Sequence, residues 1–455
     1  MRQFERISHR QLDVALYLSA TAVVVAYSID SVWGHDITRP LLTLMLFALL
    51  LFTAVPLSPL FGLTGYLLLA HGLPRYSAIH DLLLTNHIFE WLCALLALDM
   101  LLRARNNQKK PDFTRRPTIL MLLFVAWIGI SLINMLLQGT PWQPDIRHHP
   151  LLFFQALVLF LLSSQYLYDE LRSFLLALVI CLIPALRWLL QPQSDFYLEG
   201  DIALLSVIAL ALALVGAVHA PGRVLRVAFA LTAVNAVTIL LIAQNRAAAV
   251  AAAAALAVLW LSAQRKALVL GTVLLGMAIV IAIATPRDYW NRFSATWSPE
   301  ASHATAKLDQ GTVQERLELW RSSYDMVRDY PWLGVGPGNY PNAVFFYNPA
   351  LANLPAHNSI AAIAAETGIP ALIFFLGLIF SILTTLVRKM AVTGSRNHQA
   401  TRMLLAAIIG FLVGGLFITR HDSPLLYLML GWAVAITRPA IIRKRSRVHR
   451  TTDHV

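Results

Sequence analysis

The chain has little charge for its length. Asp, Glu, Lys and Arg make up 13% of its 455 residues, whereas a soluble domain carries about 25%. Hydrophobic residues make up 58%, and the mean hydropathy is +0.63. This composition excludes an ordinary soluble enzyme. It predicts an all-α polytopic integral membrane protein surrounded by membrane lipids.

The net charge of +12 does not indicate a nucleic-acid partner. The basic residues lie in loops between apolar segments, where they act as topology signals. We therefore expect no nucleic acid to bind.

Cysteine is also scarce. The two cysteines, Cys93 and Cys181, both fall inside apolar segments, so a disulfide or metal framework is not expected. The outer loops show no paired aspartates of the kind that hold a metal, and the segment GVGPG at 334–338 lacks the Lys-Ser/Thr ending of a phosphate-binding P-loop. We predict no metal and no cofactor.

Long apolar runs are abundant. Fourteen stretches have spanning length, at 13–31, 40–56, 58–73, 84–103, 118–137, 150–168, 172–190, 202–219, 224–243, 247–263, 267–285, 360–387, 402–419 and 424–440. The second and third are short and are joined by Pro56-Leu-Ser-Pro59, so one of them could be a re-entrant or broken helix. We predict 12 to 14 transmembrane helices.

The distribution of basic residues predicts the orientation. With the N-terminus in the cytoplasm and alternating spans, 24 of the 36 Lys and Arg residues fall on the cytoplasmic side. The chain then divides into N-terminal transmembrane helices at 1–285, a large periplasmic loop with short amphipathic helices at 286–358, C-terminal transmembrane helices at 359–441 and a basic cytoplasmic tail at 442–455. No ATP is available in the periplasm, so an enzyme facing it must use a substrate that is already activated.

Three arginines lie at the outer ends of spans, against the positive-inside trend: Arg187, Arg246 and Arg420. Any one of them could simply snorkel to the lipid headgroups. Together they suit an anionic ligand such as a diphosphate, which arginine binds through two parallel hydrogen bonds. The acidic cluster at 199–201, also in an outer loop, could orient an arginine or a sugar hydroxyl, or contact only solvent.

A polar interval at 311–370 interrupts the apolar sequence. Thr312 and Glu315 have capping-box spacing, which predicts that a helix begins there. Arg316 and Arg321 lie on that helix, and an apolar stripe including Leu317, Trp320 and Tyr324 would face the membrane or the bundle. The helix should break at 330–340, where Gly334, Gly336 and Gly338 permit tight turns and close backbone approach.

The sequence His357-Asn358-Ser359 stands directly before a long apolar helix. Asn358 or Ser359 is a natural N-cap, and a helix N-terminus favours an anion. His357 would then lie where a phosphate can dock, and neighbouring arginines would lower its pKa and keep it neutral, as a base requires. The alternative is that His357 is an ordinary interfacial loop residue. Glu366 is an acid at the top of the same span and could hold a partner in place.

These residues resemble the O-antigen ligase/polymerase superfamily of GT-C-type membrane glycosyltransferases. The resemblance rests on Arg316-x-x-x-Trp320, Pro331-Trp-Leu-Gly334-Val-Gly336, Ala356-His357-Asn358 and Glu366-x-Gly368 before a span. Elsewhere it rests on topology, with about 12 spans and one large periplasmic loop before the last three. Gln244-Asn-Arg246 resembles the family's Ser-Arg motif, with Asn in place of Ser.

The resemblance implies an inner-membrane O-antigen ligase whose active site faces the periplasm. Its donor would be a glycan on undecaprenyl diphosphate and its acceptor a hydroxyl of lipid A–core. His357 would be the catalytic base, and Arg246, Arg316, Arg187 and Arg321 would bind the donor diphosphate, with Asn358, Glu366 and Arg420 in support.

Three other functions remain open. An O-antigen or exopolysaccharide polymerase would use the same donor, although polymerases commonly show two large outer loops. A protein O-glycosyltransferase often carries extra soluble sequence after the last span. A polyprenyl-glycan flippase would show charges near the membrane midplane and repeat symmetry, and the sequence shows neither.

Overall fold

The computed structural model describes residues 59–72, 88–105, 114–138, 151–190, 200–243, 245–263, 304–392 and 397–438. In these ranges the regular secondary structure is helical and no strand occurs. The predicted all-α class is therefore confirmed, and the protein is a polytopic membrane protein.

Eleven of the predicted apolar stretches correspond to helices. These are α3 (Pro59–Gly72), α5 (Ile88–Arg105), α6 (Arg116–Leu137), α7 (Leu151–Tyr166), α8 (Glu170–Leu190), α9 (Gly200–His219), α10 (Arg223–Ala243), α11 (Arg246–Leu261), α16 (Ser359–Ala391), α17 (His398–Gly415) and α18 (Pro424–Ile436). The stretches at 13–31, 40–56 and 267–285 lie outside the described residues. Within the described part, α6, α9, α10, α16 and α17 are long and apolar enough to cross a bilayer. The total of 12 to 14 spans stays a prediction.

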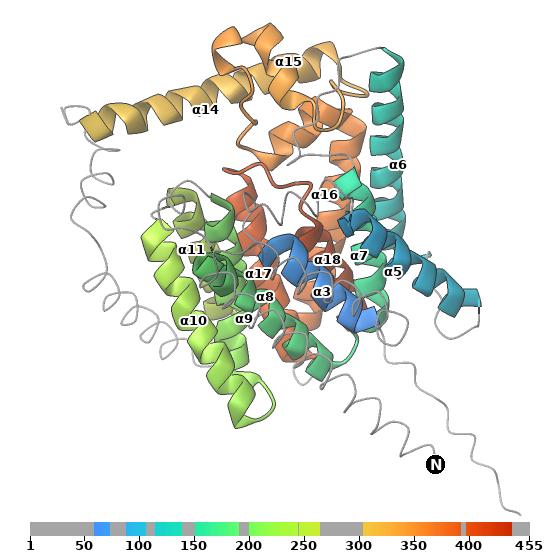
Figure 1. The fold of residues 1–455 in the computed structure, drawn as a ribbon, viewed down its shortest axis with the longest axis vertical. Coiled ribbons are helices and arrows are strands. Elements are labelled where there is room, and N and C mark those ends of the chain that lie inside the picture. Colours follow the sequence, from blue (N-terminus) through green and yellow to red (C-terminus); the bar gives the residue numbers. More distant parts are fainter. Residues whose placement is uncertain are drawn as a thin grey trace, which may run out of the picture.

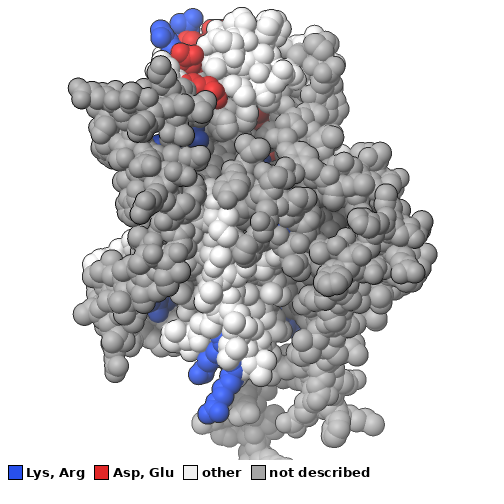
Figure 2. Space-filling view, turned by 60° about the vertical axis from the view of Figure 1, so that its left-hand side comes forward, with Lys and Arg blue, Asp and Glu red and all other residues white. Residues whose placement is uncertain are grey.

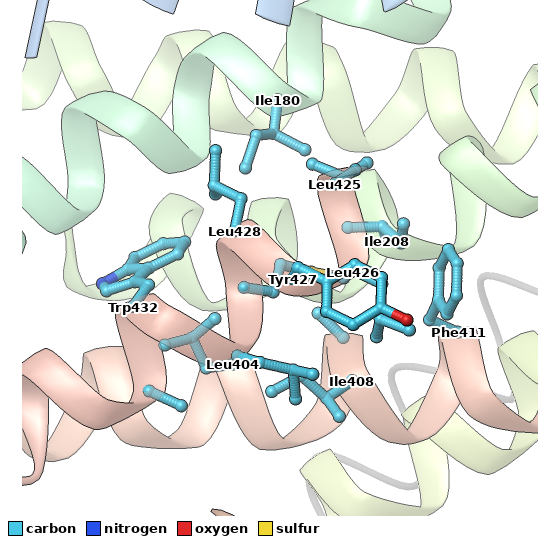
Figure 3. Packing of buried hydrophobic residues seen from close by; sticks show 14 of the residues in the cluster. Ile180, Ile208, Leu404, Ile408, Phe411, Leu425, Leu426, Tyr427, Leu428 and Trp432 are labelled. Carbon is cyan, nitrogen blue, oxygen red and sulfur yellow. The ribbon is translucent and has the colours of Figure 1, made fainter. Parts of the chain in front are cut away.

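The centre of the bundle consists of helices that are apolar on all sides. Helix α18 is buried along its whole length, as expected for a helix that is hydrophobic all round. It packs against α7 and α17, while α9 packs against α8, α10, α11 and α17. Figure 3 shows side chains of α17 and α18 interlocking with Ile208 of α9 and Ile180 of α8.

A smaller helical layer lies across one end of this bundle (Figure 1). It consists of α14 (Ala304–Asp329), α15 (Tyr340–Tyr347) and the short 3-10 helix η3 (Pro349–Leu351). A second hydrophobic core joins this layer to the first turns of α16, with members Leu319, Met326, Tyr340, Ala343, Val344, Leu351, Ala356, Ala362 and Ala365. The end layer is therefore fixed to α16 by packing and not only by the chain.

The charged side chains visible in Figure 2 lie toward the two ends of the molecule, with a largely uncharged band of described residues between them. This arrangement suits a protein that crosses a bilayer, because charges in the hydrocarbon region are costly.

One prediction about α14 was wrong. The helix begins at Ala304, so Thr312 of the expected capping box lies inside it; the residues before Thr312 include several good helix formers, and one interior glycine costs only about 1 kcal/mol. On the predicted apolar stripe, Leu317 and Tyr324 are exposed, so they do not pack in the bundle, and the membrane-facing alternative stays a prediction. The buried face carries Leu319, Ser322, Ser323 and Met326. Small hydroxyl residues let α14 approach α15, where Ser323 and the Tyr340 hydroxyl lie 2.9 Å apart.

Helix α16 is interrupted at Gly368, whose φ of 82° and ψ of 172° are not helical. Pro370 follows and has no N–H to donate to the Glu366 carbonyl. The N–H of Ile369 turns instead to the Pro331 carbonyl at 2.8 Å. The break therefore removes the usual helical donors from the carbonyls of Ala365 and Glu366.

The glycine-rich turn at 331–338 supplies the missing donors. Val335 N–H donates to the Ala365 carbonyl and Gly336 N–H to the Glu366 carbonyl, both at 2.9 Å. Such close approach needs residues without a side chain, since a Cβ on Gly334 would lie 2.3 Å from the Glu366 carbonyl carbon. From α6, the Ser131 hydroxyl donates to the Leu333 carbonyl at 2.5 Å, which holds the turn from its other side.

Replacement of Gly334 by Ala tests this docking. Gly334 has a φ of +64° and lies against the backbone of α16. We therefore expect Gly334→Ala to lower the free energy of unfolding by about 1–3 kcal/mol. Thermal unfolding of the detergent-purified protein measures the effect. Gly129→Ala in α6 is the control, because a Cβ there meets nothing within 4 Å. Equal melting temperatures for the two variants would contradict the docking.

Candidate active site

His357 lies between η3 and α16, at the level of the end layer. Its φ is +50°, an uncommon conformation for a residue with a side chain. The following residue, Asn358, is the N-cap of α16 and accepts hydrogen bonds from the N–H groups of Ile360 at 2.9 Å and Ala361 at 3.1 Å. Of the two predicted capping residues, Asn358 therefore has this role. The histidine is half-buried directly before the positive end of a long helix.

The environment of His357 favours the neutral imidazole. Burial is the largest cause, and the positive charges of Arg316 and Arg420 add to it, so the pKa falls to about 4. We predicted the direction of this shift from the arginines alone, whereas burial contributes more. At pH 7 the ring can accept a proton without first losing one.

Arg316 and Arg246 form a pair of like charges. Burial is the largest cause that lowers the pKa of Arg316, followed by the positive charge of Arg246; Glu315 acts in the opposite direction. The two arginines come from α14 and from the first turn of α11, which are far apart in the sequence. Two guanidinium groups held near each other are disfavoured unless an anion lies with them, so this pair suits a phosphate-type ligand.

The start of α11 fixes Arg246. Asn245 is the N-cap, and its side chain accepts a hydrogen bond from Ala248 N–H at 3.0 Å. Asparagine and serine are comparable N-caps. An Asn at this position can therefore cap α11 as a Ser could, and Arg246 lies at the helix start.

Arg420 joins three segments. Its guanidinium makes a two-point ion pair with the Asp201 carboxylate at the start of α9, and both side chains are largely buried. Its backbone N–H donates to the Ser359 hydroxyl at 2.9 Å, and that hydroxyl donates to the Ile418 carbonyl at 3.0 Å. The alternative in which the 199–201 acids orient an arginine is therefore the one that occurs, through Asp201.

Glu366 is buried beneath the glycine-rich turn. Its Oε2 accepts a hydrogen bond from Gly338 N–H at 3.1 Å and lies 3.5 Å from Nε2 of His421, which is also buried. The carboxylate therefore ties α16 to the glycine turn and to the segment between α17 and α18. We predicted that Glu366 holds a partner in place, and the partners that it contacts are Gly338 and His421.

Two predicted diphosphate ligands are not grouped with His357 by the described interactions. Arg187 is buried in the last turn of α8, which packs against α9, α10 and α3. Arg321 is exposed on α14, about 140° around the helix from Arg316 because each residue turns the helix by about 100°. Their roles stay predictions.

Sequence reasoning missed His421 as the partner of Glu366, and it named the acids at 199–201 without identifying Arg420 as their partner. Asp201 and His421 were visible as polar residues near the ends of apolar stretches, but only the fold shows which residue each one meets. Among the described residues, no group of three His, Cys, Asp or Glu side chains is placed to hold a metal ion.

The site combines a neutral imidazole with a positively charged region. His357 provides a neutral imidazole, Arg316 and Arg246 provide positive charges, and α16 begins there with the positive end of its dipole. Such a site can deprotonate a hydroxyl beside a bound phosphate or diphosphate.

Comparison with known families agrees with this geometry. Residues 227–376 match the family model described as O-antigen ligase. The match runs from α10 into α16 and includes Arg246, Arg316 and His357, so the resemblance found in the sequence is confirmed over this segment. No curated protein matches the chain in a sequence search.

The low pKa of His357 can be tested without turnover. Modification by diethyl pyrocarbonate requires the neutral imidazole, so its rate at His357, followed by peptide mass spectrometry, should have a midpoint near pH 4. Arg316→Gln removes one neighbouring positive charge and should raise the midpoint. Arg321→Gln, an exposed change on the same helix, should not. Identical midpoints in the two variants would show that Arg316 does not act on His357.

Proposed function

We propose that the protein is an O-antigen ligase. It transfers a glycan from undecaprenyl diphosphate to a hydroxyl of lipid A–core on the periplasmic face of the bacterial inner membrane. The observation that carries the proposal is that Arg316 lies within electrostatic range of both His357 and Arg246. One proton acceptor thus adjoins one anion-binding pair. The matched O-antigen ligase family supports the same reaction class.

In the proposed reaction His357 is the base. Its neutral imidazole takes the proton from the acceptor hydroxyl while the hydroxyl oxygen forms a bond to the anomeric carbon of the donor glycan. The bond between that carbon and the diphosphate oxygen breaks, and undecaprenyl diphosphate leaves with the electron pair. Attack from the side opposite the leaving group inverts the anomeric centre.

In this proposal arginines bind the diphosphate and stabilise its negative charge. Arg316 and Arg246 bind the diphosphate and stabilise the charge that grows on it as the bond breaks. Arg420 is held by Asp201 and therefore acts chiefly on the field around His357. The reaction is metal-independent, because the arginines provide the positive charge that a metal would otherwise bring.

Two other functions remain candidates. An O-antigen polymerase would use the same base and arginines with a second lipid-linked glycan as acceptor, and the matched family is compatible with it. The single large loop before the last spans favours the ligase. A polyprenyl-glycan flippase would also bind a diphosphate through arginines, but it has no use for a histidine kept neutral beside them.

Replacement of His357 separates catalysis from folding. His357→Ala should abolish glycan transfer from a lipid-linked donor while the protein still inserts and melts normally. The matched control is His219→Ala at the far end of α9, about 27 Å along the helix from Asp201. Transfer at the wild-type rate by the His357 variant would exclude it as the base.

Replacement of Arg316 tests donor binding. Arg316→Gln should raise the KM for the donor by about tenfold or more, since a charge-assisted bidentate contact is lost, whereas Arg321→Gln should change it little. A chelator should leave the rate of both proteins unchanged. Turnover that stops with chelator and returns with added divalent metal would contradict an arginine-based site.

A further inference from the structure

An apolar slot lies beside the candidate active site. Its volume is about 190 Å³. Its walls come from α16, α17 and the start of α18, and its lining includes Phe375, Leu376 and Ile379 of α16 and Phe411 and Leu412 of α17. Leu376 at its rim is 44% exposed, so the slot opens toward the surroundings of the bundle. No charged Asp, Glu, Lys or Arg side chain lines it.

One end of the slot is polar. Ser359 and His421 line it there, and the Ser359 hydroxyl accepts the backbone N–H of Arg420 at 2.9 Å. His421 is 2% exposed, and its Nδ1 atom is buried without a hydrogen-bond partner among the described residues. A buried polar atom of this kind is uncommon, so this end of the slot offers a polar group to a ligand.

The slot therefore reaches the first turn of α16, directly after His357 and the N-cap Asn358. A ligand that filled both regions would have a charged head next to the arginines and a hydrocarbon chain beginning directly beside it. An apolar cavity of about 150 Å³ holds a benzene-sized molecule. The slot can accordingly take a short length of branched chain and not a whole lipid tail.

We propose that this slot binds the first isoprene units of the polyprenyl diphosphate, those nearest the diphosphate. The inference rests on the proposed function and extends it to the chain of the donor. The donor's hydrocarbon begins one ester bond from its diphosphate. The acceptor hydroxyl, in contrast, belongs to a sugar that the core glycan separates from its acyl chains. Only the donor therefore places hydrocarbon beside the diphosphate, and the end of the slot lined by Ser359 and His421 would lie next to the oxygen atoms at that junction.

Filling the slot from its rim tests the proposal. Leu376→Trp places a larger side chain at the opening. Ile373→Trp, one turn earlier on α16 and 60% exposed, is the matched control outside the slot. The full-length protein in nanodiscs would be titrated with a short prenyl diphosphate, with a straight-chain alkyl diphosphate and with inorganic diphosphate. Leu412→Trp fills the slot from α17 and serves if the first variant is unstable.

We expect wild-type protein to bind the prenyl diphosphate at least about tenfold more tightly than the straight-chain one, since a shaped apolar pocket discriminates by such factors. Leu376→Trp should remove that preference and leave the affinity for inorganic diphosphate unchanged, while Ile373→Trp should change neither. Unaltered prenyl diphosphate binding in the Leu376 and Leu412 variants would overturn the proposal. So would an equal loss for inorganic diphosphate, because the substitutions would then act on the head site.

These titrations need no turnover, so they are independent of the transfer reaction. Absence of glycan transfer by wild-type protein would refute the ligase function while the binding result still decides the slot. In a parallel transfer assay, an increased KM for lipid A–core in Leu376→Trp, with the donor KM unchanged, would assign the slot to acyl chains and overturn the proposal.

Discussion

The exchange of backbone hydrogen bonds at the break in α16 determines the geometry of the site. Gly368 and Pro370 deprive the carbonyls of Ala365 and Glu366 of their helical donors, and the turn at 331–338 provides replacements. Buried carbonyls without donors are costly, so the turn and the helix stabilise each other. The turn also joins α14 to α15. Through it the end layer, with Arg316, is held at a fixed height above the first turn of α16.

The arginines that act on His357 and Arg316 have different surroundings. Asp201 neutralises Arg420 through a two-point ion pair, whereas the described neighbours of Arg316 include the like charge of Arg246. A site in which positive charges from α11 and α14 lie within electrostatic range of each other suits an anion carrying more than one negative charge. Burial and this positive field together keep His357 neutral, so anion binding and proton acceptance can occur side by side.

Much of this arrangement follows from local sequence. The length of the apolar stretches predicts the helices of the described bundle. His357, Asn358 and Glu366 can be singled out as candidates because they are polar residues at or near the start of a predicted span. Partner identities do not follow, because the Arg420–Asp201 and Glu366–His421 pairs join segments distant in the chain. The start of α14 was misplaced since its capping signal also fits a helix interior. The exposure of Arg321 depends on which face of α14 packs, and that buried face carries Leu319, Ser322, Ser323 and Met326.

The central claim is that Arg316 and Arg246 bind one diphosphate next to His357. A cryo-electron microscopy structure of the full-length protein with a bound polyprenyl diphosphate tests it most directly. The account predicts density for the diphosphate between the two guanidinium groups, within hydrogen-bond distance of both and beside the His357 imidazole. A diphosphate bound elsewhere, or held by only one of these arginines and away from His357, would contradict it.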